Sequence, residues 1–192
     1  MEKLIENQND SFRLAFADFD NTLNIVFTYD YISGLVELNW YDIFIYIEKG
    51  FLPYHAAIEY ATEQIDENSN EDVVSLVTLN LDKECFVDSI NQYVDNLSKL
   101  VPTELQKETA NKIIYVILYW LLTEKQKCNY IDLQNNIDVI CADFGYPNIL
   151  SNLCSYAKHS PKKIKSVKKP MDRLVAFLKE DLAKLQLLVG KK

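Results

Sequence analysis

The chain has 192 residues, of which 48% are hydrophobic and 25% are charged. This composition is typical of a globular protein with one core, and it excludes a chain that stays disordered. The net charge of −8 is unevenly distributed. Residues 1–96 hold 19 Asp and Glu against 4 Lys and Arg, whereas residues 97–192 hold 9 against 16. Such polarity either attracts a charged partner or reflects a solvated acidic face packed near a basic one.

The N-terminal segment and the apolar runs predict a cytoplasmic protein. Its first ten residues, MEKLIENQND, lack the basic patch and apolar stretch of a secretion signal. The longest apolar run, IIYVILYWLL at 113–122, falls well short of the roughly 20 residues that span a bilayer. We therefore expect a cytoplasmic protein with no membrane partner.

The cysteines indicate neither a metal site nor a disulfide framework. They are widely spaced without a CxxC pair, and only two histidines accompany them. Free cysteine packs as a small hydrophobic residue, so we expect reduced, buried thiols and no metal or cofactor. The four positions are Cys85, Cys128, Cys141 and Cys154.

Helices are predicted through most of the chain, because glycines are few and apolar residues recur at spacings of three and four. Asn39 predicts the cap of a helix over residues 40–47, which Gly50 ends. Pro53 predicts the first turn of a second helix. Asn70 and Asp82 predict the caps of two more.

The second half is predicted to hold the central helix. Pro102 indicates the start of a long helix, about 103–124, that is apolar nearly all round and belongs inside a bundle. Asp132 predicts another helix to about Phe144. Residues 158–169 carry six lysines and predict an exposed basic loop, and residues 170–189 predict a final amphipathic helix. We expect a single all-α domain over residues 1–192, with about 7–9 helices around the central one.

One motif resembles a catalytic signature. In AFADFDNTL, Asp18, Asp20 and Thr22 match the DxDxT pattern of haloacid-dehalogenase-type phosphatases, in which the first Asp is the nucleophile and Mg²⁺ is bound nearby. The further acidic pair of those enzymes is hard to place in this sequence. We therefore predict no catalytic residue and keep a Mg²⁺-dependent phosphatase as an alternative. Phosphoesterase activity that Asp18→Asn abolishes would support it.

The acidic and aromatic tracts predict a protein-binding surface instead. Lysines 158–169 lack the interleaved aromatic residues of a nucleic-acid site, so we expect no nucleic-acid partner. The tracts FTYDY (27–31) and NWYDIFIYI (39–47) mix aromatic rings that anchor interfaces with carboxylates that steer a basic partner. The predicted contact residues are Asp30, Tyr31, Glu37, Tyr41, Asp42, Tyr46, Glu48, Glu63, Asp66, Glu67, Glu71 and Asp72.

Three stretches carry a resemblance: residues 38–61 (LNWYDIFIYIEKGFLPYHAAIEYA), residues 119–122 (YWLL) and above all residues 139–150 (VICADFGYPNIL). Over about residues 30–188 the chain resembles a bacterial helical family, formerly of unknown function, found beside polymorphic and contact-dependent growth inhibition toxins as immunity proteins. The resemblance implies a monomer that forms a heterodimer with a cognate toxin domain, a basic nuclease being favoured, and covers its active or substrate-binding site. A general helical adaptor is the alternative, and a toxin domain encoded immediately upstream distinguishes the two.

Overall fold

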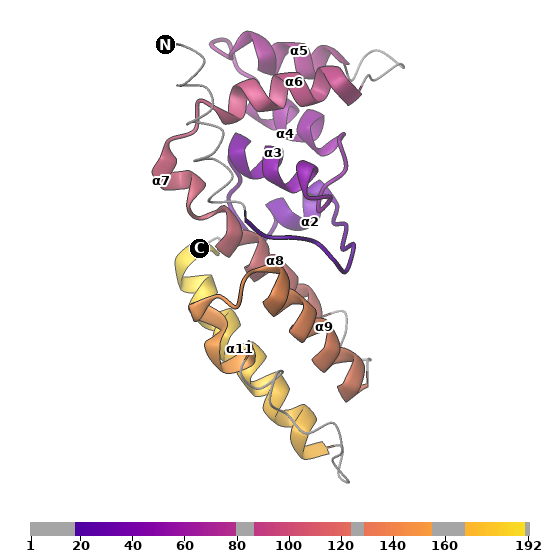
Figure 1. Ribbon diagram of the computed structural model, residues 1–192. Coiled ribbons are helices and arrows are strands. Elements are labelled where there is room, and N and C mark those ends of the chain that lie inside the picture. Colours follow the sequence, from indigo (N-terminus) through magenta and orange to yellow (C-terminus); the bar gives the residue numbers. More distant parts are fainter. Residues whose placement is uncertain (1–17, 80–86, 124–128, 155–167, 191–192) are drawn as a thin grey trace, which may run out of the picture. The chain divides into compact units, whose positions relative to one another are not determined.

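The computed structural model describes residues 18–79, 87–123, 129–154 and 168–190. These residues form nine α-helices and one 3-10 helix, with no β-strand among them (Figure 1). The predicted all-α fold class is confirmed. The chain divides into two compact units: unit 1 is Met1–Leu23 with Ala110–Lys192, and unit 2 is Asn24–Thr109. The extent of a single domain over residues 1–192 stays a prediction.

Unit 2 is built from six described helices: α2 (Tyr29–Ser33), α3 (Trp40–Glu48), α4 (Ala56–Gln64), α5 (Glu71–Leu79), α6 (Val87–Ser98) and α7 (Thr103–Gln106). Helix α3 packs against α4 and α6, while α5 packs against α4 and α6, and α2 packs on α4. Fully buried Ile43, Leu76 and Ile90 come from three of these helices, so their apolar faces form the unit's core.

Local sequence signals fix both ends of α3. The Asn39 side chain accepts a hydrogen bond from the Asp42 amide, and the Asp42 carboxylate accepts one from the Asn39 amide, so the two form a capping box. At the other end Gly50 has a φ of 75°, a left-handed conformation that glycine adopts without steric cost. The predicted bounds of this helix are confirmed.

The other predicted helix starts have mixed outcomes. Asn70 does cap α5, since its side chain accepts a hydrogen bond from the Asp72 amide. Helix α4 begins at Ala56, because Pro53 lies in the preceding turn and its carbonyl accepts the Ala56 amide. Asp82 lies outside the described residues.

The predicted long helix is broken into α7 and α8 (Thr109–Thr123). Residues 113–118 are all buried, so the part that is apolar all round is confirmed. Tertiary hydrogen bonds hold Thr109, the first residue of α8 after the break. Its hydroxyl donates to the Asp42 carboxylate (2.6 Å), and its carbonyl accepts from the Tyr46 hydroxyl (2.7 Å). Within the described ranges, no helix combines the length and apolar character that a bilayer crossing requires.

Unit 1 contains most of α8 together with α9 (Tyr130–Asp143), the 3-10 helix η2 (Asn148–Leu150) and α11 (Lys168–Val189). Asn129 caps α9, three residues before the predicted start at Asp132. Helix α11 packs on α9 and η2. The predicted basic loop, 158–169, lies mostly outside the described residues, and its last two residues are already in α11.

The cysteine prediction is wrong for one pair. Cys141 and Cys154 form a disulfide, with their Cα atoms 5.7 Å apart. A turn at Gly145, whose φ is 63°, ends α9 and lets the chain return so that the helical residues 151–154 reach its last turn. A separation of 13 residues without a CxxC motif gave no local signal of this pairing. Cys85 and Cys128 lie outside the described residues.

Candidate partner-binding surface

The two units also differ in charge, although their bounds differ from the division at residues 96 and 97 seen in the sequence. Unit 2 holds 16 Asp and Glu against 4 Lys, a net charge of −12, whereas unit 1 holds 12 against 16 Lys and Arg, a net charge of +4. Most of the described acids of unit 2 are exposed. Because exposed charges of one sign on one compact body add to a common field, unit 2 presents an anionic surface.

A groove of about 520 Å³ lies between α2 and α4 on this unit. Exposed carboxylates of Asp30, Glu59 and Glu63 line it, with His55 beside Glu59 at an Nε2–Oε1 distance of 3.6 Å. The Tyr29 hydroxyl donates to the Glu63 carboxylate at 2.5 Å and ties the two helices together. Burial, followed by the hydrogen bond and charge of Glu63, raises the pKa of Tyr29 well above its ordinary value. The Tyr29 hydroxyl therefore remains protonated at neutral pH and donates to Glu63.

The acidic connection between α4 and α5 continues from the end of this groove. Glu67 and Glu71 are exposed, and no hydrogen bond or ion pair of their carboxylates occurs among the described residues. Asp66 has a structural role instead. Its carboxylate accepts from the Asn68 amide and the Ser69 hydroxyl, which holds the turn. We name Asp30, Glu59, Glu63, Glu67 and Glu71 the α4 acidic surface.

Three predicted contact residues are wrong, because they belong to the core of unit 2. Tyr41, Asp42 and Tyr46 are each 0% exposed. Helix α3 packs against both α4 and α6. Tyr31 is half-buried and stacks on Phe27 with ring centroids 5.4 Å apart. The aromatic part of the predicted surface is therefore mainly structural.

The remaining predicted residues do not form one cluster. Asp30 and Glu63 line the α2–α4 groove, and Glu48 lines a separate pocket. Glu37 is exposed between α2 and α3, and Asp72 is half-buried in the first turn of α5.

Sequence reasoning missed three exposed residues at the start of α4. Glu59 and His55 line the groove, and Tyr54 is 41% exposed in the turn after Pro53. A signal for them exists, because residues flanking a helix start after a proline are usually solvated, and Glu59 lies one turn beyond His55.

The DxDxT segment lies in unit 1 and is bound to the end of α9. The Thr22 hydroxyl and amide donate to the two carboxylate oxygens of Asp143, at 2.6 and 3.0 Å. The Phe19 ring stacks on Phe144 at 4.9 Å, while Asp18 and Asp20 are exposed. In the part of the chain that the structure describes, no group of three His, Cys, Asp or Glu side chains is arranged to hold a metal ion. Thr22 thus secures the segment to α9.

Comparison with known proteins places most of the chain in one family. Residues 29–182 match the family described as "Uncharacterized protein conserved in bacteria (DUF2247)". No curated protein and no solved structure matches the chain. The matched range begins at the first residue of α2 and ends within α11, so it takes in parts of both units.

Proposed function

The chain belongs to the bacterial family DUF2247, and from this premise and the charge of unit 2 we propose that it is an immunity protein that binds and neutralises a cognate bacterial toxin domain. The toxin surface it covers is basic, as in a nuclease whose cleft binds a polyanion. The observation that carries the proposal is the net charge of −12 on a compact helical unit.

A strongly anionic unit suits this task for two physical reasons. Its field speeds the diffusional encounter with a cationic protein, by roughly 10- to 1,000-fold in steered complexes. It also favours binding where the substrate's own phosphates bind, since both carry negative charge. A lethal toxin must be captured soon after it appears, so a high association rate is the property under selection.

The α4 acidic surface is the part of unit 2 that we assign to the contact. It combines a groove of about 520 Å³ with exposed carboxylates that continue into the α4–α5 connection. A stable inhibitor complex buries roughly 1,600 Å² in total, which is a surface that several helices supply together. Close charge pairs at such an interface couple by roughly 1.5–7 kcal/mol.

The test starts from the gene neighbourhood and ends with kinetics. The toxin domain encoded immediately upstream is purified, and association with this protein is followed by stopped flow at several salt concentrations. We expect Glu67→Lys with Glu71→Lys to lower the association rate at least about tenfold at low salt and to flatten its salt dependence. These two positions are chosen because both are exposed, whereas Asp66 holds its turn and Asp72 is half-buried.

A matched control makes the same charge change in the other unit. Asp138 and Asp172 are exposed on α9 and α11, so Asp138→Lys with Asp172→Lys changes the net charge equally without touching unit 2. We expect this control to retain a rate within about threefold of the wild type at physiological salt, where a Debye length of roughly 8 Å limits steering to charges near the contact. Equal effects of both double variants would refute the assigned surface. A lone gene without a toxin neighbour would favour the adaptor alternative.

A further inference from the structure

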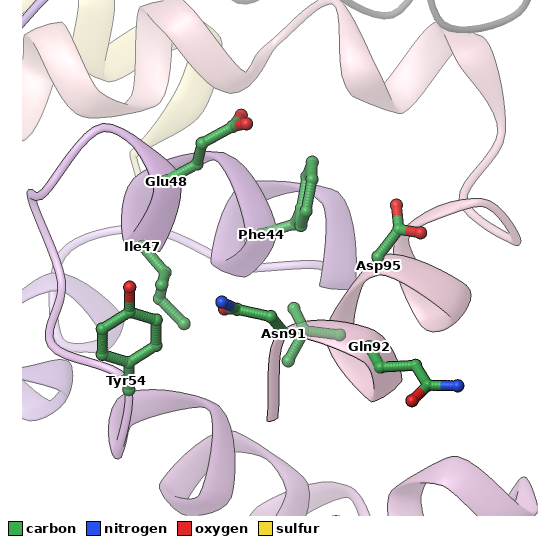
Figure 2. Close-up of a pocket in the computed structure, with 8 residues that line it drawn as sticks. Phe44, Ile47, Glu48, Tyr54, Asn91, Gln92 and Asp95 are labelled. Carbon is green, nitrogen blue, oxygen red and sulfur yellow. The ribbon is translucent and has the colours of Figure 1, made fainter. Parts of the chain in front are cut away.

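A second pocket of unit 2 shares no lining residue with the groove between α2 and α4. It has a volume of about 420 Å³ and lies between α3 and α6 (Figure 2). Helix α3 contributes Phe44, Ile47 and Glu48, while α6 contributes Asn91 and Asp95. Tyr54, from the turn before α4, and Asp95 lie at opposite ends of the pocket in this view. The pocket therefore has aromatic and aliphatic walls with carboxylates at its margin.

Those walls are suited to a flat cation with an apolar stem. The aromatic faces of Phe44 and Tyr54 attract a cation through their quadrupole, and Ile47 packs against methylene groups. The amide of Asn91 supplies a carbonyl acceptor for an N–H donor. A volume of about 420 Å³ is at the lower end of the roughly 300–1,000 Å³ of ligand sites, which fits one long side chain.

The two carboxylates are not equivalent. Asp95 already pairs with Lys99 on the same helix, at an Nζ–Oδ2 distance of 2.6 Å. Glu48 is exposed at the last turn of α3, and no ion pair of its carboxylate occurs within the described ranges. Glu48 is therefore the carboxylate whose charge a bound cation would neutralise.

We propose that this pocket takes the side chain of an arginine on the partner protein, with its guanidinium stacked on the aromatic wall and donating to Glu48. Arginine fits better than lysine because its planar group stacks on rings, donates in a fork to a carboxylate and is more weakly hydrated. We assign this arginine to a partner protein, because the unit that holds the pocket carries a net charge of −12 and is proposed to bind a basic protein. This step rests on the proposed function for the identity of the partner.

The test uses the full chain and a probe that needs no toxin. N-acetyl-arginine N-methylamide is titrated into the ¹⁵N-labelled protein, in parallel with the lysine and citrulline counterparts and with free arginine. We expect saturable shifts at residues 44–48, 54 and 91–95, with a dissociation constant in the millimolar range. We expect binding of the lysine probe to be about fivefold weaker, and no saturation with citrulline, which is neutral.

Two variants separate this pocket from general attraction to acids. Glu48→Gln should weaken the arginine probe at least about fivefold, because it removes the charge and keeps the shape. Glu104→Gln makes the same charge change at an exposed position of unit 2 outside the pocket and outside the α4 acidic surface, and it should leave the affinity unchanged. The proposal is overturned if both variants weaken binding equally, or if citrulline saturates like arginine. Free arginine binding at least about tenfold more tightly than the blocked probe would make this an amino-acid site instead and would also overturn it.

The toxin assay reports on the two proposals separately. If the arginine probe does not bind but the toxin is bound normally, the pocket proposal is overturned and the immunity function is not. Saturable probe binding without any toxin capture leaves the pocket standing and removes the immunity function.

Discussion

The buried pair of Asp42 and Thr109 offers the sharpest test of how unit 2 is held together. The Asp42 carboxylate closes the capping box of α3 through the Asn39 amide and accepts the Thr109 hydroxyl at the start of α8. Both side chains are 0% exposed. The sequence alone predicted Asp42 as a partner contact, so the perturbation also separates the two interpretations of this residue.

The magnitude follows from the two bonds. Asp42→Ala removes a capping interaction worth about 1 kcal/mol and leaves the buried Thr109 hydroxyl without its acceptor, which costs about 1–3 kcal/mol. We expect a loss of about 3 kcal/mol in the free energy of unfolding. Thr109→Val removes the hydroxyl donor to the carboxylate and should cost about 1–2 kcal/mol.

Urea denaturation followed by circular dichroism measures both variants and their combination. With a slope of about 2 kcal/mol per molar urea, Asp42→Ala should lower the midpoint by about 1.5 M. The double variant should lose about 1–2 kcal/mol less than the sum of the single variants, because the shared hydrogen bond is removed only once. Strict additivity, or a loss under about 0.5 kcal/mol for Asp42→Ala, would refute the reasoning.

Two more predictions concern pH and redox state. Burial, then the charges of Asp42 and Glu63, raises the pKa of Tyr60 from its ordinary 10.0 to about 12. Because the folded state holds the Tyr60 proton more tightly than the unfolded state, the protonated hydroxyl stabilises the fold. That stabilisation is complete below pH 10 and is lost as the pH rises towards 12. Urea midpoints from pH 8 to 12 should show that Tyr60→Phe flattens this alkaline loss, and an unchanged slope would contradict it. Reduction of Cys141–Cys154, or Cys141→Ser with Cys154→Ser, should lower stability by about 3 kcal/mol, as expected for a loop of this length. Midpoints measured with and without reductant test this, and equal midpoints would refute it.

The sequence by itself determined the fold class and the elements whose signals are local. Asn39 and Gly50 set the ends of α3, and the continuous apolar run at 113–122 marked a buried helix, because capping and periodicity depend only on neighbours along the chain. The sequence also indicated which residues match the family. The resemblance over about residues 30–188 agrees with the matched range 29–182, whereas the immunity function stays a proposal.

Only the tertiary structure decided which polar and aromatic residues face solvent. Tyr41 and Asp42 lie in an aromatic and acidic tract that is typical of an interface, yet contacts with residues far along the chain bury both. The Cys141–Cys154 bond likewise depends on the path of the chain after α9, which no spacing rule encodes. Local sequence sets where each helix begins and ends. Which face of a helix is buried depends on the segments that pack against it, and these lie far away along the chain.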